Sequence, residues 1–494
     1  MKVAGIVAEF NPLHTGHERI MNYCRKELGA DAVIVCMSGD FVQRGEPAII
    51  NKYVRAGAAI GSVSEENSAI ESLPVPEGKS ATARIRSGAD LCIELPVIGA
   101  TANAEVFART GVNTLLSTGI VTDLVFGSES GDEGAIENAA RLLLDEPPEF
   151  KASLNECMKS GLSYPAAMAK AAAACGTDAA IFNNPNDLLG LLYVKALLEY
   201  EKAHGTSQVS FHAYKREGAG HDESACTGDE YASSSALRKT IGILYGPLET
   251  ALATPDADEI DLEELEKNEK DFLKQNLSPA GLSVINTAIK DCSFVFPDDI
   301  SLLLHEKLYS VNGPESTSGN TSAGLFPKTD LTIFSDIDED LTNRILRRRE
   351  DFTTFTEYAE ALDARNYTRA RLRRALLHIV LGITDEAAAS LQKCNYAPYI
   401  HVLAMNEVGT KLLGEMKAGR NAHLHEGEQP SKTNSAGQTP VFCALSEPAA
   451  RELSEDAAIC LQKDIFADEL YNIILTGKTG MAHKNEFSKK VIRV

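Results

Sequence analysis

Two histidines and a glycine near the N-terminus have the residue types and the spacing needed for chemistry at a phosphate. His14, Gly16 and His17 follow an apolar run, Val3–Ala8, and a short turn. The run predicts a buried strand. The histidines then stand where a helix begins, so that N–H groups of its first turn can face a phosphate, which Gly16 does not obstruct. Two imidazoles there would stabilise the charge that develops on an α-phosphate while a bound nucleophile displaces pyrophosphate.

The H-x-G-H spacing resembles the signature of adenylyl-transferring nucleotidyltransferases. Two histidines three residues apart also occur by chance at an ordinary solvated helix start. The position of this tetrapeptide, after an N-terminal strand and a turn, favours the nucleotide site.

Alternating strand and helix patterns position these residues. Apolar runs predict strands at 32–37, 91–95, 124–126 and 209–213, and helical periodicity predicts helices at 17–28, 105–117 and 186–202. Such alternation is typical of a mostly parallel sheet covered on both faces, with ligands at the carboxyl ends of the strands. His14 and His17 would lie at such an end.

The second half of the chain is predicted to be mainly helical, with helices at 341–349, 356–362 and 369–381. The expected fold is therefore α/β, a Rossmann-like parallel-sheet nucleotidyltransferase domain (1–246) followed by a mainly α-helical domain (331–494). An acidic linker and helical connection (247–330) would join them. Within it, residues 256–271 carry nine acids and two lysines and predict a solvated linker helix. Polar stretches at 55–88, 312–324 and 423–439 predict surface loops.

The composition excludes several classes of protein. A formal charge of −22 argues against nucleic-acid binding by the whole surface of this 494-residue chain. None of the ten cysteines forms a C-x-x-C pair, which favours reduced thiols and predicts no metal site. No apolar run approaches the ~20 residues that span a bilayer, and the N-terminus enters its first strand without room for a signal peptide. We therefore expect a cytoplasmic protein with no membrane contact.

Arginine is concentrated in one part of this acidic chain. Residues 344–374 hold nine arginines against five acidic residues. The planar guanidinium suits phosphate contacts, although a helical face with internal salt bridges explains the same composition. The candidate RNA-binding residues are Arg365, Arg369, Arg371, Arg373 and Arg374. A second, smaller basic cluster at the C-terminus comprises Lys484, Lys489, Lys490 and Arg493.

Further short motifs carry polar groups at strand ends and helix starts. They are MSGDFVQRGEP (37–47), GADLCIELP (88–96), FGSE (126–129), PNDLLG (185–190), KREG (215–218) and SSSALR (233–238). Each alone is also explained as an ordinary turn or helix cap. Asn186 or Asp187 could cap a helix and face a ligand, and SSSALR offers hydroxyls and an arginine to a triphosphate. No Walker motif is present, which disfavours γ-phosphate transfer.

Taken together, these motifs resemble the bacterial tRNA(Met) cytidine acetate ligase family. The resemblance covers nearly the whole chain, and its specific motifs lie before Arg238. It implies that ATP activates acetate to acetyl-adenylate. The acetyl group then passes to the exocyclic amine of the wobble cytidine of elongator tRNA(Met). ATP, with Mg²⁺ expected beside it, acetate and this tRNA are the implied ligands, and no protein partner is implied.

The resemblance also assigns site residues. His14 and His17 would be catalytic, and Gly127, Asn186 and Arg216 would complete an ATP site. The main stretch of that site would comprise Val7, Ala8, Glu9, Phe10, Asn11, Pro12, Leu13, His14, Thr15, Gly16, His17, Glu18, Arg19 and Ile20.

The chain departs from the family pattern in three places. The insert after Arg55 is longer than expected, Asp40 stands where Asn or His is expected, and Leu13 stands where Phe is usual. None of these departures removes a histidine or Gly16.

Two other functions stay open. A small-molecule nucleotidyltransferase would explain the histidines and SSSALR but leaves the second half of the chain without a role. A non-catalytic RNA-binding protein on the same fold would explain the arginines, but the intact H-x-G-H turn argues against it. Dependence on acetate and on tRNA would discriminate among the three.

Overall fold

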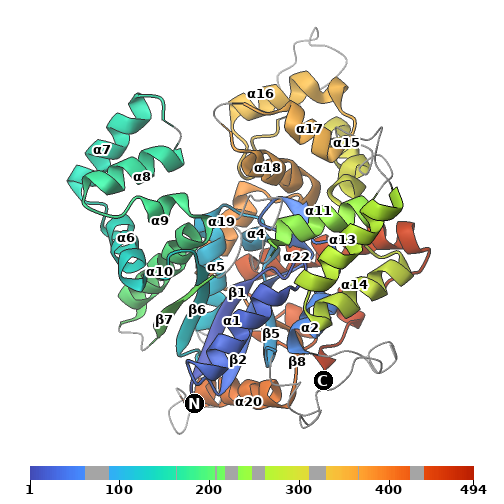
Figure 1. Cartoon of the computed structure of the whole chain (residues 1–494), viewed down its shortest axis with the longest axis horizontal. Helices are drawn as coiled ribbons and strands as arrows, with labels where there is room; N and C mark the ends of the chain where they lie inside the picture. Colours follow the sequence, from blue (N-terminus) through green and yellow to red (C-terminus); the bar gives the residue numbers. More distant parts are fainter. Residues whose placement is uncertain are drawn as a thin grey trace.

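A single mixed sheet runs through the molecule and draws strands from both ends of the chain (Figure 1). The computed structural model describes residues 1–61, 88–162, 164–205, 209–216, 232–246, 262–310, 330–364, 367–422 and 439–494. Within these residues the strand order is β10-β8-β5-β2-β1-β6-β7. The parallel part consists of β1 (Val3–Ala8), β2 (Ala32–Ser38), β5 (Leu91–Leu95), β6 (Asp123–Ser128) and β7 (Ser210–Lys215).

Side chains alternate between the two faces of this sheet, and both faces are buried. Val3 and Ile34 enter one core, whereas Ala4 and Val35 enter another on the opposite face. Burial on both faces explains why these strands are nearly continuous apolar runs. The first face is covered by α5 (Ala104–Leu116), α6 (Glu133–Asp145), α10 (Pro185–His204) and α20 (Glu407–Ala422), and the second by α1 (Thr15–Lys26) and α2 (Lys52–Ile60).

The chain order of the strands reverses beside β1. From β1 the chain adds β2 and β5 on one side and then returns to place β6 and β7 on the other. Loops that leave β1 and β6 at their carboxyl ends therefore diverge. In open α/β sheets, ligands bind in the crevice at such a point.

Two helical groups complete the molecule. The first shares a core that includes Leu304, Leu372 and Tyr471, and comprises α15 (Ser301–Ser310), α16 (Glu339–Arg348), α17 (Phe355–Ala361), α18 (Arg369–Leu381), α19 (Asp385–Lys393) and α22 (Glu455–Thr479). The second comprises α11 (Ser234–Tyr245), α13 (Leu262–Asn276) and α14 (Pro279–Asp291).

The remaining elements belong to neither helical group. They are the hairpin β3 (Phe41–Val42) and β4 (Glu46–Pro47), the helices α4 (Val97–Ala100), α7 (Pro148–Lys159), α8 (Tyr164–Ala174), α9 (Ala180–Asn183) and α21 (Glu447–Ala450), and the 3₁₀ turns η4 (Pro297–Ile300), η5 (Arg349–Asp351) and η6 (Glu486–Ser488).

The predicted fold class is confirmed, with one addition from the second half of the chain. Strand β8 (Ile400–Met405) pairs antiparallel with β5, and β9 (Val441–Phe442) and β10 (Ile492–Arg493) pair with β8. No strand was predicted there, because a fully buried six-residue apolar run has no strand periodicity. The division of the chain at residue 246 remains a prediction, and the described sheet crosses it.

The predicted acidic linker helix is partly buried. Helix α13 places Leu273 in a core with Leu237 and Ile285, and Glu269 accepts a hydrogen bond from the Thr240 hydroxyl at 2.6 Å. Leu273 lies beyond the acidic stretch 256–271, and the described side chains within that stretch are exposed or half-buried, so only the end of α13 that follows it is buried. Residues 256–261, most of the predicted loop at 55–88, and the predicted loops at 312–324 and 423–439 except its last residue lie outside the described residues.

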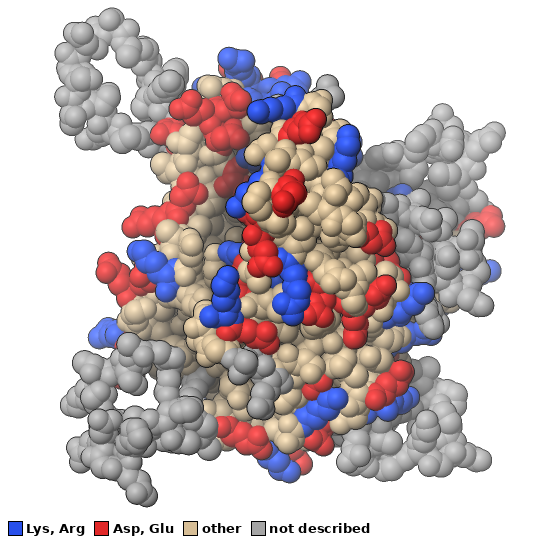
Figure 2. Space-filling view, turned by 90° about the vertical axis from the view of Figure 1, so that its left-hand side faces the viewer, with Lys and Arg blue, Asp and Glu red and all other residues tan. Residues whose placement is uncertain are grey.

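Charge is mixed on the face shown in Figure 2, where acidic and basic side chains alternate rather than forming an area of one sign. No helix among the described residues has the length and apolar character to cross a membrane. The nine described cysteines are free thiols.

Candidate active site

His14 and His17 stand at the first turn of α1, at the carboxyl end of β1. His14 is the N-cap of the helix, and its Nδ1 accepts a hydrogen bond from the Gly16 N–H at 3.0 Å. The His14 N–H in turn donates to Nδ1 of His17 at 3.3 Å. The two rings lie 3.8 Å apart between centroids. The expected placement of the motif between a strand and a helix is therefore what the structure has.

The hydrogen bonds fix which nitrogen of each ring can donate. Because Nδ1 of both histidines accepts a backbone N–H, the proton of each neutral ring is on Nε2. Nε2 of His14 lies 3.0 Å from the Ser234 hydroxyl on α11. His17 therefore presents an Nε2–H donor that forms no hydrogen bond within the described chain.

Both imidazoles are neutral at physiological pH. Burial, together with the nearby positive charges of Arg216 and Arg238, lowers the pKa of His14 to about 3. Burial, His14 and Arg216 lower the pKa of His17 well below its ordinary value. The pair can therefore stabilise developing phosphate charge as hydrogen-bond donors rather than as imidazolium ions.

A glycine is required at position 16 for a structural reason, in addition to access for phosphate. A Cβ at this position would lie 2.9 Å from Cε1 of His14, so any side chain would displace the ring. The Gly16 N–H, which the sequence analysis expected to face a ligand, already bonds to His14. The helix start therefore offers fewer free N–H groups than expected, because the histidine caps it.

The predicted residues Gly127, Asn186 and Arg216 come together opposite the histidines. Arg216 donates to Oδ1 of Asn186 at 3.0 Å, and Asn186 donates to Glu129 at 2.6 Å. A Cβ on Gly127 would lie 3.3 Å from the Arg216 side chain, so the glycine lets the arginine lie along the end of β6.

Asp187, the other helix-start candidate, has a different role. It is buried and accepts hydrogen bonds from backbone or hydroxyl groups of Ser128, Glu129 and Ser130. Because these contacts use its carboxylate to join β6 to α10, Asn186 rather than Asp187 faces the site.

Helix α11 supplies further polar side chains beside the histidines. Arg238 donates to the Asn11 carbonyl at 2.8 Å, and its Nε lies 3.1 Å from Oε1 of Glu46. Ser234 contacts His14 from the same helix. Ser234 and Arg238 belong to SSSALR, the motif predicted to offer hydroxyls and an arginine to a triphosphate. Glu46 lies in the motif 37–47 but was given no role, because a hairpin is an ordinary position in sequence.

The loop between β1 and the histidines is held by groups from outside it. Phe10 has a φ of 47°, and the Asn11–Pro12 peptide bond is cis. The Gln43 N–H donates to the Glu9 carboxylate at 2.9 Å, and buried Arg55 donates to the Glu9 carbonyl. Arg55 also donates to the Ser38 and Gly39 carbonyls, so it joins the ends of β1 and β2.

The other predicted ATP-site residues have mixed surroundings. Ala8, Leu13 and Ile20 are buried in the core beneath α1, together with Phe10, and Val7 packs against a core on the opposite face. The Thr15 hydroxyl donates to the Asn276 carbonyl, and Glu18 and Arg19 are half-buried. These residues support the motif, and their contact with a ligand remains a prediction.

The arginines predicted to bind RNA on α18 are already paired with acids. Arg371 contacts Asp338 at 3.0 Å, and Arg369 contacts Asp363 at 3.6 Å. Arg373 lies 3.3 Å from Glu46, and Arg374 lies 3.4 Å from Asp336. Arg365 lies outside the described residues. Only Arg369 is largely exposed, so the salt-bridged alternative describes this helix well.

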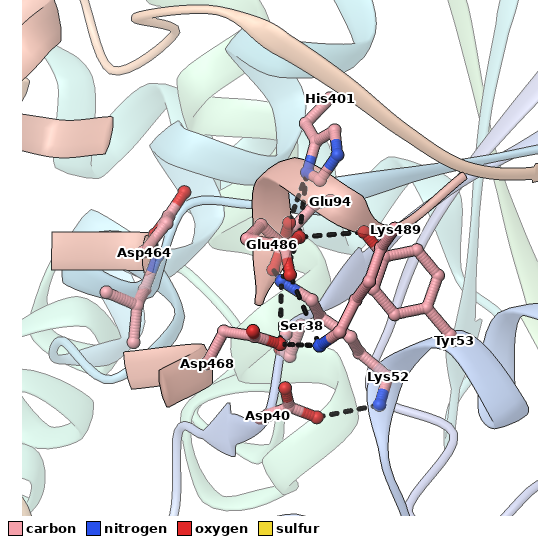
Figure 3. Close-up of polar contacts among 12 residues, drawn as sticks. Ser38, Asp40, Lys52, Tyr53, Glu94, His401, Asp464, Asp468, Glu486 and Lys489 are labelled. Carbon is pink, nitrogen blue, oxygen red and sulfur yellow. Dashed lines mark hydrogen bonds and ion pairs between the residues drawn. The ribbon is translucent and has the colours of Figure 1, made fainter. Parts of the chain in front are cut away.

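Lys489 of the C-terminal basic cluster is not a surface residue. It lies 2.6 Å from Asp468 in a buried group of charges that sequence analysis did not detect (Figure 3). Lys52 lies at its centre, 2.8 Å from Glu94 and 2.9 Å from Glu486. These residues come from four separate segments of the chain, which explains why no local pattern revealed them.

The spacing of Glu94, His401 and Glu486 would allow a metal ion. The Lys52 ammonium already contacts both carboxylates, and His401 bonds to Glu94 at 2.6 Å. These contacts balance the charge without an ion, and the group serves to attach α22 and η6 to the sheet.

Comparison with known proteins supports the fold and identifies relatives of the chain. A model of the HIGH nucleotidyl transferases matches residues 1–65 and 79–486. The tRNA(Met) cytidine acetate ligase of Acetivibrio thermocellus is 31% identical over 84% of this chain and 86% of its own. The ligase of that name from Fervidobacterium nodosum is 27% identical, with both chains fully covered. The crystal structure of Thermotoga maritima TmcAL bound with alpha-thio ATP has the same fold, with a TM-score of 0.73, 24% identity and full coverage of both chains.

Proposed function

The chain belongs to the tRNA(Met) cytidine acetate ligase family of the HIGH nucleotidyl transferases, and from this premise we propose that it acetylates the wobble cytidine of elongator tRNA(Met). The reaction uses ATP and acetate and proceeds through acetyl-adenylate. The observation that carries the proposal is the neutral histidine pair at the switch point of the sheet, with Arg216 and Arg238 beside it.

In the first step an acetate oxygen attacks the α-phosphate of ATP, and the bond from that phosphorus to the pyrophosphate oxygen breaks. Negative charge increases on the non-bridging oxygens in the transition state. The Nε2–H of His17 is the donor available for that charge, and Arg216 and Arg238 balance the triphosphate. No protein nucleophile is required, because acetate itself attacks.

In the second step the exocyclic nitrogen of cytidine attacks the acetyl carbonyl, AMP leaves, and the nitrogen loses a proton. The cytidine must leave its stack in the anticodon loop to reach the adenylate, which requires a surface that grips RNA. We assign part of that surface to Arg369 on α18, the predicted arginine that is largely exposed.

Mg²⁺ is expected wherever ATP reacts. The carboxylates beside the site are engaged: Glu129 accepts from Asn186 and Asp187, and Glu46 contacts two arginines. These carboxylates therefore do not form a set of protein ligands for Mg²⁺. We therefore propose that Mg²⁺ reaches the site bound to the triphosphate and water, as this small ion commonly does.

The decisive experiment supplies radiolabelled acetate, ATP and unmodified elongator tRNA(Met) and measures label on the tRNA. We expect label that requires ATP and is lost in His14→Ala. Consumption of ATP with a different metabolite and no label on the tRNA would instead support a small-molecule nucleotidyltransferase. The absence of any turnover, with tRNA still bound, would support a non-catalytic RNA-binding protein.

A further inference from the structure

An exposed aromatic and cationic surface lies on the helical group formed by α15, α16 and α17, together at the top of Figure 1. The guanidinium carbon of Arg349 lies 4.8 Å from the centre of the Tyr309 ring, and the Tyr309 side chain is 52% exposed. Behind it, the His305 ring stacks on Phe352 at 4.9 Å with an angle of 16° between the rings. His305 also meets Tyr309 edge-on at 5.1 Å. We call these four residues the stacking platform.

The arginines beside the platform differ from those of α18. Arg347 and Arg349 form no ion pair with any residue that the structure describes, whereas Arg371, Arg373 and Arg374 each contact a carboxylate. Arg348, between the first two, has only an exposed contact with Asp351 at 3.4 Å. In a chain with a net charge of −22, Arg347 and Arg349 are therefore guanidinium groups without an ion-pair partner among the described residues.

An exposed ring with an arginine on it, next to unpaired guanidinium groups, has the chemistry that unpaired nucleotides require. Bases stack on aromatic rings and on guanidinium planes, and neighbouring arginines bind the adjoining phosphates. Arginine suits this combination better than lysine because its plane both stacks and donates in a fork.

We propose that the platform and Arg347 bind an unpaired nucleotide of the substrate tRNA and its phosphate, at a place separate from the reacting cytidine. The inference rests on the proposed function, since it takes the RNA to be tRNA. The helices also connect this place to the active site. Helix α15 packs in one core with α18, and Arg373 of α18 reaches Glu46 beside Arg238.

The test uses the full-length chain with an unmodified elongator tRNA(Met) transcript. We measure the KM for tRNA in acetylation, and separately the acetate-dependent exchange of pyrophosphate into ATP, which needs no tRNA. Tyr309→Ala is expected to raise the KM for tRNA about tenfold, the size typical of a lost stacking contact. Tyr309→Phe, which keeps the ring, should change it less than twofold. Both variants should retain pyrophosphate exchange.

Arg347→Ala tests the phosphate contact. It should weaken tRNA binding and reduce the salt dependence of the binding constant by roughly 0.7 to 0.9 in the log–log slope. Arg141→Ala is the matched control, because Arg141 is also exposed but lies on α6 and pairs with Glu137. It should leave the slope unchanged.

The outcomes separate the two proposals. If the unaltered protein does not acetylate tRNA, the proposed function fails. If it does, but Tyr309→Ala and Arg347→Ala keep the normal KM and salt slope, the platform does not bind tRNA and is a surface for a protein partner or for none. A loss of pyrophosphate exchange in Tyr309→Ala would also overturn the proposal, because the residue would then support the catalytic fold.

Discussion

Arg238 and Arg373 share the carboxylate of Glu46. Arg238 Nε lies 3.1 Å from one oxygen of Glu46, and Arg373 Nη1 lies 3.3 Å from the other. Arg238 belongs to the candidate ATP site, and Arg373 lies 135 residues later on helix α18 of the other helical group. One buried side chain from the β3–β4 hairpin therefore joins the site of adenylate formation to the helix predicted to contact tRNA.

Glu46→Gln should impair both steps. Loss of the Glu46 charge releases Arg238, which also donates to the Asn11 carbonyl. Misplacement of a site residue by about 1 Å can cost about 10²-fold in rate. We expect a tenfold to hundredfold loss of acetate-dependent pyrophosphate exchange. Arg373→Gln, which removes only the α18 contact, should keep that exchange and weaken tRNA acetylation alone. Full exchange in Glu46→Gln would refute this role.

His17→Ala should abolish adenylate formation without unfolding the chain. The residue contributes an Nε2–H donor whose removal typically costs about 10²–10³ in rate. Pyrophosphate exchange measures the loss, and circular dichroism checks the fold. His204→Ala is the matched control, because His204 lies at the exposed end of α10. Unchanged pyrophosphate exchange in His17→Ala would contradict the role of His17 as a donor to the phosphate.

Stability should fall as the pH drops below 6.5. The pKa of His14 is about 3 in the folded chain and about 6.5 when unfolded, so only the unfolded state gains a proton across this window. The contribution of this residue to stability is complete above pH 6.5 and decreases towards pH 3. Between pH 7 and pH 5 the loss is about 2 kcal/mol from His14 alone.

Urea denaturation at pH 7 and pH 5 measures that loss. His14→Gln cannot take up a proton in either state, so its free energy of unfolding should fall less between the two pH values than that of the unaltered chain. An equal fall in both proteins would show that His14 does not hold the lowered pKa.

Lys52→Met should destabilise the fold by about 3–5 kcal/mol, because it removes the buried cation that Glu94 and Glu486 share. Lys2→Met is the surface control. Lys2 is 40% exposed and lies 3.4 Å from Asp123, so its loss should cost at most about 1 kcal/mol. Similar free energies of unfolding for the two variants would show that the buried group contributes little.

Charge reversal at Arg369 tests α18 as a tRNA-binding helix. Arg369→Glu should weaken tRNA binding at fixed salt and leave pyrophosphate exchange intact, because its side chain is 72% exposed and contacts Asp363 at 3.6 Å. Unaltered affinity for tRNA would mean that the arginines of α18 stabilise the fold, as Arg371 and Arg374 do through their ion pairs.

The strand, turn and helix around His14 and His17 could be predicted from the residues alone, because local patterns decide local structure. Apolar runs mark strands buried on both faces, and a histidine, a glycine and a turn mark the helix start. The same patterns placed Gly127, Asn186 and Arg216 at strand and helix ends. The topology of a parallel sheet then brings such ends to one edge.

Which charges are free and which are paired depends on the packing of the folded chain. In sequence, Arg373 and Arg347 are equivalent members of one arginine-rich stretch, but Glu46 neutralises the first from more than three hundred residues away. Likewise, Lys52, Glu94 and Glu486 meet only because β5, α2 and the C-terminal segment pack together, and β8 joined the sheet without any local periodicity. The partners of a side chain depend on long-range packing, and a pattern within a short window of sequence holds no information about that packing.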